Sequence, residues 1–281
     1  MTRAGADGRV VLVTGGAGGI GAALIAALLG DGHRVAAVDR DASGLDRLLS
    51  RHGGAGDRLA AIDADLEQEA GCRAAVEEAV RRFGRVDAVV NNAGIGVSGL
   101  RPDAETNLPR IEELTAEVWD RFFAINVRAP MLVTQAAVPG MRRRGWGRIV
   151  NNTTSYLTML RVLPYGATKS ALESISAIWA KELEGSGITV NVLVPGGPTD
   201  TPFVSDASGI PRDKMLRPEV MGPPLSWLLS DEAAEFTGRR IIAGRWDTAL
   251  PPAEAAAEVA RPIGWPELTQ DVIWPGGGPG G

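Results

Sequence analysis

Arg9-Val-Val-Leu-Val-Thr14 and Gly15-Gly-Ala-Gly-Gly-Ile-Gly21 stand next to each other near the start of the chain. After Arg9 the first run is continuously apolar, as expected for a parallel strand that is buried on both faces. A helix is predicted from about Ile20 to Leu29. Glycines let the backbone turn tightly and approach a pyrophosphate, while free N–H groups at the helix start attract its charge. The stretch therefore predicts a dinucleotide-binding unit, and its candidate cofactor contacts are Gly15, Ala17, Gly18, Gly19, Ile20 and Gly21.

A second strand, predicted over Arg34–Asp39, ends in an acid. Asp39 follows the glycine loop at about the 20-residue spacing that is typical of a ribose-binding carboxylate. A carboxylate there accepts hydrogen bonds from ribose hydroxyls and repels a 2′-phosphate, which favours NAD over NADP. Arg40 is a competing signal, because an arginine can hold that phosphate. The sequence therefore predicts NAD, with Arg40 as a further contact and NADP as the less favoured cofactor.

Strands and helices alternate through the next part of the chain. Leu59–Leu66 is a predicted strand, Glu67–Phe83 is an amphipathic helix, and Val86–Val90 is a strand that runs into Asn91-Asn92-Ala93-Gly94. Alternation at these lengths predicts parallel strands that are joined by right-handed crossovers. The fold class is therefore α/β, with a doubly wound sheet.

Tyr165 and Lys169 are four residues apart in a helix predicted over Tyr165–Leu183. Positions i and i+4 of a helix share a face, so the phenol and the ammonium can meet. A nearby cation favours the phenolate and lowers a pKa that is otherwise about 10. Such a tyrosine can exchange a proton with an alcohol or a carbonyl. Because two surface side chains often have this spacing, the prediction depends on the rest of the chain.

The composition argues against several function classes. With 44% hydrophobic and 22% charged residues, the chain has an ordinary globular mix. A net charge of −5 argues against a nucleic-acid partner. One cysteine allows no intrachain disulfide, and together with two histidines it argues against a metal site. The most apolar helix, Ile20–Leu29, is too short to cross a bilayer, and a cytoplasmic location is expected.

Five motifs fall in the order and spacing of the short-chain dehydrogenase/reductase (SDR) family, and the chain resembles its common form of about 250 residues. They are Thr14-Gly15-x-x-x-Gly19-x-Gly21, Asp39, Asp65-Leu66, Asn91-Asn92-Ala93-Gly94 and Tyr165-x-x-x-Lys169. The match covers roughly Arg9 to Asp247. The resemblance implies a Rossmann fold with a parallel sheet of about seven strands in the order 3-2-1-4-5-6-7. It also implies a homo-oligomer, either a tetramer or a dimer.

The resemblance implies further cofactor contacts in the loops that follow the strands. Asp65 and Leu66 would flank the adenine, and Asn92–Gly94 would lie along the cofactor. The segment Pro195–Gly197 and Thr201 would receive the nicotinamide carboxamide. In full, these implied contacts are Asp65, Leu66, Asn92, Ala93, Gly94, Pro195, Gly196, Gly197 and Thr201, besides Tyr165 and Lys169.

Two later segments have expected roles around the site. The dehydrogenase domain is predicted to span residues 1–247, with a substrate-covering loop at about 203–217 and Thr199 as an alternative to Thr201. The tail, 248–281, contains Trp265 and Trp274. Two tryptophans predict that the tail docks on this subunit or on a neighbouring one.

Asn126 matches the fourth catalytic residue of the family, inside a helix predicted over Glu117–Met141. Pro130 has no N–H, so the carbonyl of Asn126 loses its usual intrahelical donor. The hypothesis is that this carbonyl holds a water that connects Lys169 to solvent. The alternative is a simple kink of the helix.

The catalytic hydroxyl is where the chain departs from the family pattern. The family's usual spacing from the strand asparagine to the catalytic serine, counted forward from Asn151, gives Thr154. The family's usual spacing from that serine to the tyrosine, counted back from Tyr165, gives Asn152. The loop before Tyr165 is therefore about two residues shorter than in the family. Residue type favours Ser155. Both Thr154 and Ser155 stay open, and residue type tips the choice toward Ser155.

These features together predict reversible hydride transfer between NAD and a small secondary alcohol or ketone, with Tyr165 as the general acid/base. One alternative is an NADPH-dependent reductase of ketoacyl thioesters, which Asp39 disfavours. The other is a catalytically idle nucleotide-binding regulatory protein, for which the irregular hydroxyl region is the only support. The sequence leaves the substrate open among sugars or polyols, hydroxy acids, steroid-like alcohols and small ketones.

Overall fold

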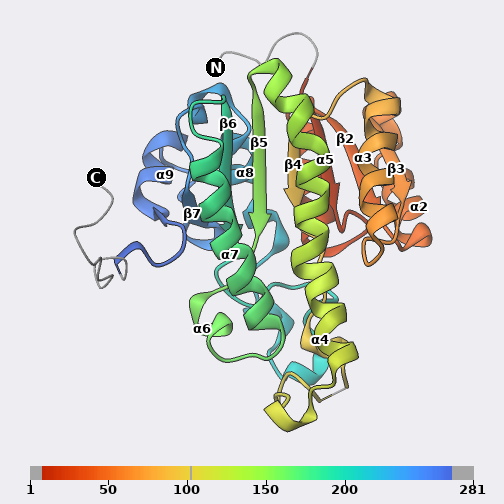
Figure 1. Cartoon of the computed structure of the whole chain (residues 1–281), viewed down its shortest axis with the longest axis vertical. Coiled ribbons are helices and arrows are strands. Elements are labelled where there is room, and N and C mark those ends of the chain that lie inside the picture. The colour runs from red at the N-terminus through yellow and green to blue at the C-terminus, as the bar shows by residue number, and fades with distance from the viewer. Residues whose placement is uncertain (1–7, 102, 268–281) are drawn as a thin grey trace, which may run out of the picture.

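The computed structural model describes residues 8–101 and 103–267, and Figure 1 shows a sheet that has helices on both faces. The strands are β1 (Val10–Thr14), β2 (Arg34–Asp39), β3 (Leu59–Asp63), β4 (Ala88–Asn91), β5 (Gly147–Asn152), β6 (Ile188–Val194), β7 (Arg239–Ile242) and β8 (Ala260–Pro262). The helices are α1 (Gly19–Gly30), α2 (Ala42–Arg51), α3 (Glu69–Phe83), α4 (Ala116–Phe123), α5 (Ala129–Arg144), α6 (Tyr156–Met159), α7 (Tyr165–Glu182), α8 (Gly222–Leu228) and α9 (Pro252–Val259).

Within the described residues, eight strands form one sheet in the order 3-2-1-4-5-6-7-8. Strands β1 to β7 all pair in parallel, so the predicted Rossmann order of the first seven strands is confirmed. The sequence did not predict β8, which pairs antiparallel with β7 at the sheet edge. Pro262 is tolerated there because an edge strand needs fewer N–H donors.

The tail therefore extends the sheet of its own subunit over its described part. The helix α9 packs against α8 and β7, and β8 follows it directly. The predicted docking of the tail as a whole stays a prediction, since Trp274 and the other residues of 268–281 lie outside the described part.

The long helix predicted over Glu117–Met141 is interrupted, so this prediction is wrong over five residues. A π-helical segment, Ala124–Arg128, separates α4 from α5, and the N–H of Ala129 donates to the carbonyl of Ala124. Pro130 has no N–H with which to continue the α-helical pattern, which explains why the interruption falls here. The segment contains Asn126.

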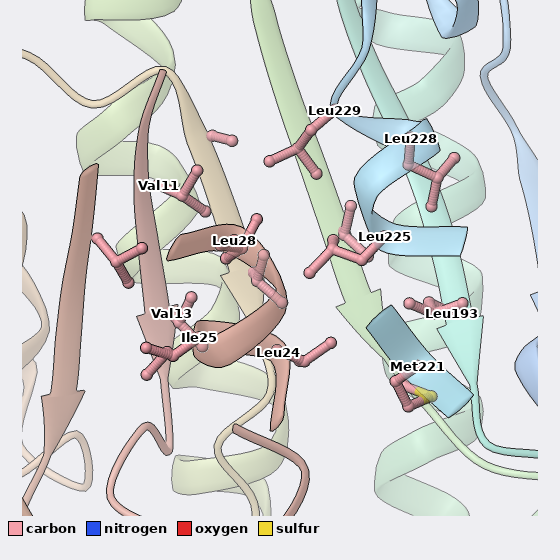
Figure 2. Close-up of a cluster of buried hydrophobic side chains, with 14 of the residues drawn as sticks. Val11, Val13, Leu24, Ile25, Leu28, Leu193, Met221, Leu225, Leu228 and Leu229 are labelled. Atoms are coloured by element: carbon pink, nitrogen blue, oxygen red, sulfur yellow. The ribbon is translucent and has the colours of Figure 1, made fainter. Parts of the chain in front are cut away.

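Two apolar layers hold the sheet. On one face, β1 packs with α1 and α8 through Val11, Val13, Leu28, Leu225 and Leu228, which are at most 1% exposed (Figure 2). The other face is covered by α3, α5 and α7, which lie in front of the sheet in Figure 1. Burial on both faces explains why the strands read as continuous apolar runs.

The strand order reverses at β1, which pairs with β2 on one side and with β4 on the other. Loops that leave the carboxyl ends of such neighbours diverge and open a crevice, the usual ligand site of open α/β sheets. Figure 1 shows α4 and α6 at the end of the molecule toward which the arrow of β5 points. The predicted site residues follow these strand ends.

Candidate active site

The glycine loop forms a backbone cradle at the start of α1. Gly15 and Gly19 have φ values of +66° and +56°, in the left-handed region that favours glycine. A Cβ on Gly21 would lie 1.9 Å from the carbonyl oxygen of Gly15, whereas a Cβ on Gly18 would meet nothing within 4 Å. The tight side of the loop therefore packs on itself, and the side at Gly18 is open. Because α1 begins at Gly19, its free N–H groups lie beside this open side, so the loop fits a dinucleotide pyrophosphate.

The loops after β1 and β4 are joined by hydrogen bonds. The hydroxyl oxygen of Thr14 accepts from the backbone N–H groups of Asn92 and Ala93, each at 3.0 Å. The side-chain amide of Asn92 donates to the carbonyl oxygens of Thr14, at 3.0 Å, and Gly15, at 3.2 Å. Asn92 therefore holds the glycine loop against β4. Its neighbour Asn91 is fully interior and donates to Asn151 at 2.8 Å, a structural role.

Asp39 caps the second βα loop and reaches the glycine loop. Its carboxylate accepts from the backbone N–H of Ala17 at 3.0 Å and from that of Asp41 at 3.1 Å. These two bonds fix the carboxylate at the carboxyl end of β2, beside the predicted pyrophosphate cradle. Arg40 is exposed.

Asp65 and Leu66 lie in the turn after β3, which ends at Asp63 and not at Leu66 as predicted. Asp65 is exposed and accepts from the backbone N–H of Glu67 at 3.0 Å. Leu66 is only 7% exposed and packs in the apolar cluster under α3. Its side chain therefore packs in the core, while Asp65 faces solvent, and the contact of the two residues with an adenine stays a prediction.

Tyr165 and Lys169 occupy the first turns of α7, on one face as predicted. The Lys169 ammonium lies 5.7 Å from the centre of the Tyr165 ring and donates to the carbonyl of Asn152 at 2.8 Å. Burial raises the pKa of Tyr165 to about 12, while a hydrogen bond with the Thr154 side chain acts in the opposite direction. The predicted lowering of this pKa is therefore not seen here, because the loss of water around the phenolate dominates.

Of the two candidate side chains, that of Thr154 interacts with the Tyr165 phenol and lowers its pKa. The Ser155 hydroxyl caps α6: it accepts from the backbone N–H of Thr158 at 3.1 Å and shares a hydrogen bond with the Thr158 hydroxyl at 2.9 Å. Capping explains the serine, since Ser is a preferred N-cap residue. These contacts favour Thr154 as the catalytic hydroxyl, whereas residue type favours Ser155, and the assignment stays a prediction.

Asn126 connects the loop after β4 with α7. Its side chain accepts from the N–H of Ile95 at 2.8 Å and donates to Ile95 O and to the Thr168 hydroxyl, both at 3.0 Å. A Cβ on Gly94 would lie 3.1 Å from Asn126 Oδ1 and 3.5 Å from Lys169 Nζ. The predicted residues Gly94, Asn126 and Lys169 are therefore neighbours.

The segment after β6 approaches the glycine loop. Gly196 has a φ of +103°, and Thr201 is 5% exposed. A Cβ on Gly19 would lie 3.3 Å from the Cβ of Thr201. The alternative threonine, Thr199, is also interior and donates to the carbonyl of Gly197 at 3.2 Å. Thr201 is the threonine that contacts the loop.

Phe203 is a site residue that the sequence analysis did not single out, beyond placing it at the start of the 203–217 loop. Its ring centre lies 5.7 Å from that of Tyr165, and a Cβ on Gly96 would meet the ring at 2.6 Å. The hydroxyl of Ser98 donates to the Phe203 carbonyl at 3.1 Å. Nothing in the local sequence marks this contact, because it joins two loops far apart in the chain.

A first prediction concerns the burial of Lys169, which lowers its pKa to about 8 because the ammonium loses water. The unfolded chain keeps this proton to about pH 10.5, so the unfolded state binds more protons between about pH 8 and 10.5. The free energy of unfolding should therefore rise with pH across this window, by about 2 kcal/mol from pH 8 to pH 10 relative to Lys169→Met. Urea unfolding of both proteins at the two pH values measures the difference. An equal pH dependence in the two proteins would show that Lys169 titrates normally.

No helix in residues 8–101 or 103–267 is long and apolar enough to cross a membrane. In the same ranges, no cluster of His, Cys, Asp and Glu side chains could hold a metal ion.

Comparison with known proteins identifies the family. The model of the short chain dehydrogenase family matches residues 9–209. The D-threitol dehydrogenase of Mycolicibacterium smegmatis is 31% identical over 84% of this chain and 91% of its own length. Two solved structures are each 32% identical. The 3-ketoacyl-(acyl-carrier-protein) reductase of Brucella melitensis, complexed with NADH, has a TM-score of 0.70 and covers 82% of this chain and 94% of its own. A blue fluorescent protein from a metagenomic library, in complex with NADPH, has a TM-score of 0.73 and covers 85% and 98%. The chain belongs to the short-chain dehydrogenase/reductase family of oxidoreductases.

Proposed function

We propose that this protein interconverts a secondary alcohol and a ketone with NAD as the hydride acceptor. The observation that carries the proposal is the grouping of the Thr154 side chain, the Tyr165 phenol and the Lys169 ammonium beside Gly94, in the loop that follows β4. These groups provide a hydrogen-bond donor for a substrate oxygen, a proton donor or acceptor, and a cation that favours the phenolate. Bound NAD would supply the redox chemistry.

The residues in place account for the transfer of the proton. In alcohol oxidation, Tyr165 takes the hydroxyl proton while the carbon-bound hydrogen leaves with its electron pair. Thr154 donates a hydrogen bond to the substrate oxygen, and Lys169 opposes the effect of burial on the phenol. Asn126 stands next to Lys169, which is compatible with the hypothesis that its main-chain carbonyl connects the lysine to solvent. In the ketone-reducing direction, the neutral phenol gives its proton to the carbonyl oxygen.

Replacement of Thr154 by alanine should lower kcat/KM for the alcohol about 10- to 100-fold, because the substrate oxygen loses a donor. Thr154→Ser should keep most of the activity. The matched control, Ser155→Ala, should cost about 1 kcal/mol of stability through loss of the α6 cap and leave kcat close to that of the wild type. Steady-state kinetics and thermal unfolding of the three variants test this, and the opposite ranking of Thr154→Ala and Ser155→Ala would assign the hydroxyl to Ser155.

NAD is the cofactor favoured by the position of Asp39. The carboxylate is fixed beside the glycine loop by Ala17 and Asp41, where a 2′-phosphate would meet its negative charge. The relatives do not decide this point, because their structures are complexed with NADH in one case and NADPH in the other. The proposed contacts are those of the glycine loop, Asp39, Asp65, the backbone of residues 92–94, and the segment from Pro195 to Thr201.

Asp39→Ser should reduce the preference for NAD over NADP, measured as the ratio of kcat/KM values, about 10- to 100-fold. The reason is the removal of a negative charge that opposes the phosphate. Asp63→Asn is the matched control, since Asp63 ends the neighbouring strand and pairs in register with Asp39. An unchanged ratio in Asp39→Ser, or an equal change in the control, would show that Asp39 does not set the preference for NAD over NADP.

We also propose that the protein is a homo-oligomer that is built on the helices around the site. An open depression on the helices α4, α5 and α7 is lined mostly by apolar side chains, which a second copy could cover; its lining comprises Phe123, Ala124, Val127, Met131 and Ile175, together with the charged Asp120 and Arg128. Light scattering gives the mass. The expected cytoplasmic location stays a prediction.

The substrate test is a panel in which polyols, hydroxy acids, steroid-like alcohols and small secondary alcohols are offered with NAD or NADP. Polyols are included in the panel because one relative is a D-threitol dehydrogenase. Absorbance at 340 nm should rise with at least one class. Consumption of NADPH with a ketoacyl thioester, and no alcohol oxidation, would favour the reductase alternative. Tight NADH binding without any turnover would favour an idle regulatory protein.

A further inference from the structure

An ion pair lies in the interior behind the candidate active site. The guanidinium of Arg240, on β7, is 2.7 Å from the carboxylate of Glu173, on α7, and the two side chains are 4% and 0% exposed. Glu173 stands one turn after Lys169 and two turns after Tyr165, so these three residues share a face of α7. The pair therefore belongs to the wall that carries the proton-transfer residues.

The pair is hydrogen-bonded to the two threonines that follow β5. One nitrogen of Arg240 donates to the hydroxyl of Thr153 at 3.1 Å as well as to Glu173, and the other donates to the main-chain carbonyl of Thr154. The Thr153 hydroxyl in turn donates to Glu173 at 2.8 Å. The planar fork of an arginine can reach these separate acceptors at once. The backbone of Thr154 is thus held through its carbonyl, while its side chain interacts with Tyr165.

Tyr156 extends this network to the tail. Its ring lies under the guanidinium of Arg240, 4.4 Å from it, and its hydroxyl donates to the carbonyl of Gly264 at 3.0 Å. The rings of Tyr156 and Trp265 are 5.8 Å apart. Arg240 itself pairs with Arg261 of β8 in the sheet register. The tail thereby covers the far side of the network.

Stability alone is a weak explanation for the pair. A buried ion pair is often no more stabilising than apolar residues of similar volume, although removal of one partner is costly. What apolar residues would not provide here is the bond to the Thr154 carbonyl. The segment between Thr154 and Tyr165 is about two residues shorter than the family pattern, so the hydroxyl has to be set by contacts that this chain supplies itself.

We propose, resting on the function proposed above, that Arg240 and Glu173 are positioning residues that hold the Thr154 hydroxyl against Tyr165. They touch neither substrate nor cofactor and act through the backbone of Thr153 and Thr154. Their loss should lower kcat and leave the affinity for NADH unchanged, because the glycine loop stands apart from them.

A double-replacement cycle separates positioning from stability. Arg240→Met and Glu173→Leu should each lower the melting temperature, since each leaves one buried charge unpaired. The double variant should recover the melting temperature while its kcat stays about tenfold or more below that of the wild type, since small displacements of a reacting group are costly. Its rate profile for alcohol oxidation should shift to higher pH, as in Thr154→Ala, because the hydroxyl no longer supports the phenolate. A double variant with wild-type kcat and pH profile would overturn the positioning role.

Arg240→Lys tests the positioning role if the apolar variants do not fold. The ammonium can pair with Glu173 but lacks the fork that also reaches Thr154 O, so kcat should fall about tenfold with little loss of stability. Wild-type kcat in this variant would contradict the proposal. Thr154→Ala separates the positioning role of Arg240 from the proposed role of Thr154. If Thr154→Ala is impaired and the Arg240 variants are not, only the positioning role is wrong. If Thr154→Ala has wild-type activity, the proposed role of Thr154 itself is wrong.

Discussion

Replacement of Tyr165 by phenylalanine is expected to lower kcat for alcohol oxidation by about 10²- to 10⁴-fold, the usual contribution of a general acid/base. Phenylalanine keeps the ring, which packs near Phe203, and removes only the hydroxyl. The fold and the affinity for NADH should therefore be unchanged. Stopped-flow or steady-state rates, together with an NADH fluorescence titration, measure both quantities.

The matched control is Tyr156→Phe, because the chain has only two tyrosines. Burial raises the pKa of both phenols to about 12, so the two are similar in acidity. The Tyr156 hydroxyl bonds to Gly264 O and Glu173, away from the reacting groups, and its loss should change kcat less than tenfold. A Tyr165→Phe variant that keeps more than a tenth of the wild-type kcat would contradict the proposed proton transfer.

Gly21→Ala is expected to weaken NADH binding about 10- to 100-fold, because overpacking of this kind costs about 1–3 kcal/mol and falls on the backbone that forms the cradle. The new methyl group would lie 1.9 Å from the Gly15 carbonyl and 2.9 Å from the Asn92 amide. The start of α1 would have to move away from the loop after β1. Fluorescence titration with NADH gives the affinity, and thermal unfolding reports the strain.

Gly18→Ala serves as the matched control for strain, since its added Cβ meets no atom within 4 Å and its φ of −167° suits any residue. Its melting temperature should equal that of the wild type. If Gly21→Ala binds NADH as tightly as the wild type does, the glycine loop is not the cofactor cradle.

The fold was largely predictable because its signals are local. Strands that are buried on both faces require apolar runs such as Val10–Val13, and the positive φ values of Gly15 and Gly19 require residues without a Cβ. The spacing of Tyr165 and Lys169 follows from the helix period. The strand β8 could not be predicted, since Ala260–Pro262 is short and pairs only because β7 offers a free edge.

The finer features of the site depend on contacts that no local pattern encodes. The Ser155 hydroxyl caps α6, while the Thr154 side chain interacts with Tyr165, and residue type predicts neither contact. The direction of the Tyr165 pKa shift depends on how completely the surrounding loops remove water. Arg240 and Glu173 come from distant parts of the chain, and the sequence shows only that β7 begins with two arginines, Arg239 and Arg240. An arginine next to the apolar part of a strand was the available signal.

The proposed activity is tested most directly by the fate of the carbon-bound hydrogen. Secondary alcohols deuterated at the carbinol carbon would be incubated, as pooled classes, with NAD and the wild-type protein. The mass of the reduced cofactor would then be measured by mass spectrometry. Hydride transfer predicts NADH that carries the deuterium, with Tyr165→Phe forming almost none over the same time. Wild-type protein that binds NADH but forms no deuterated NADH from any class would contradict the proposed oxidation of secondary alcohols with NAD.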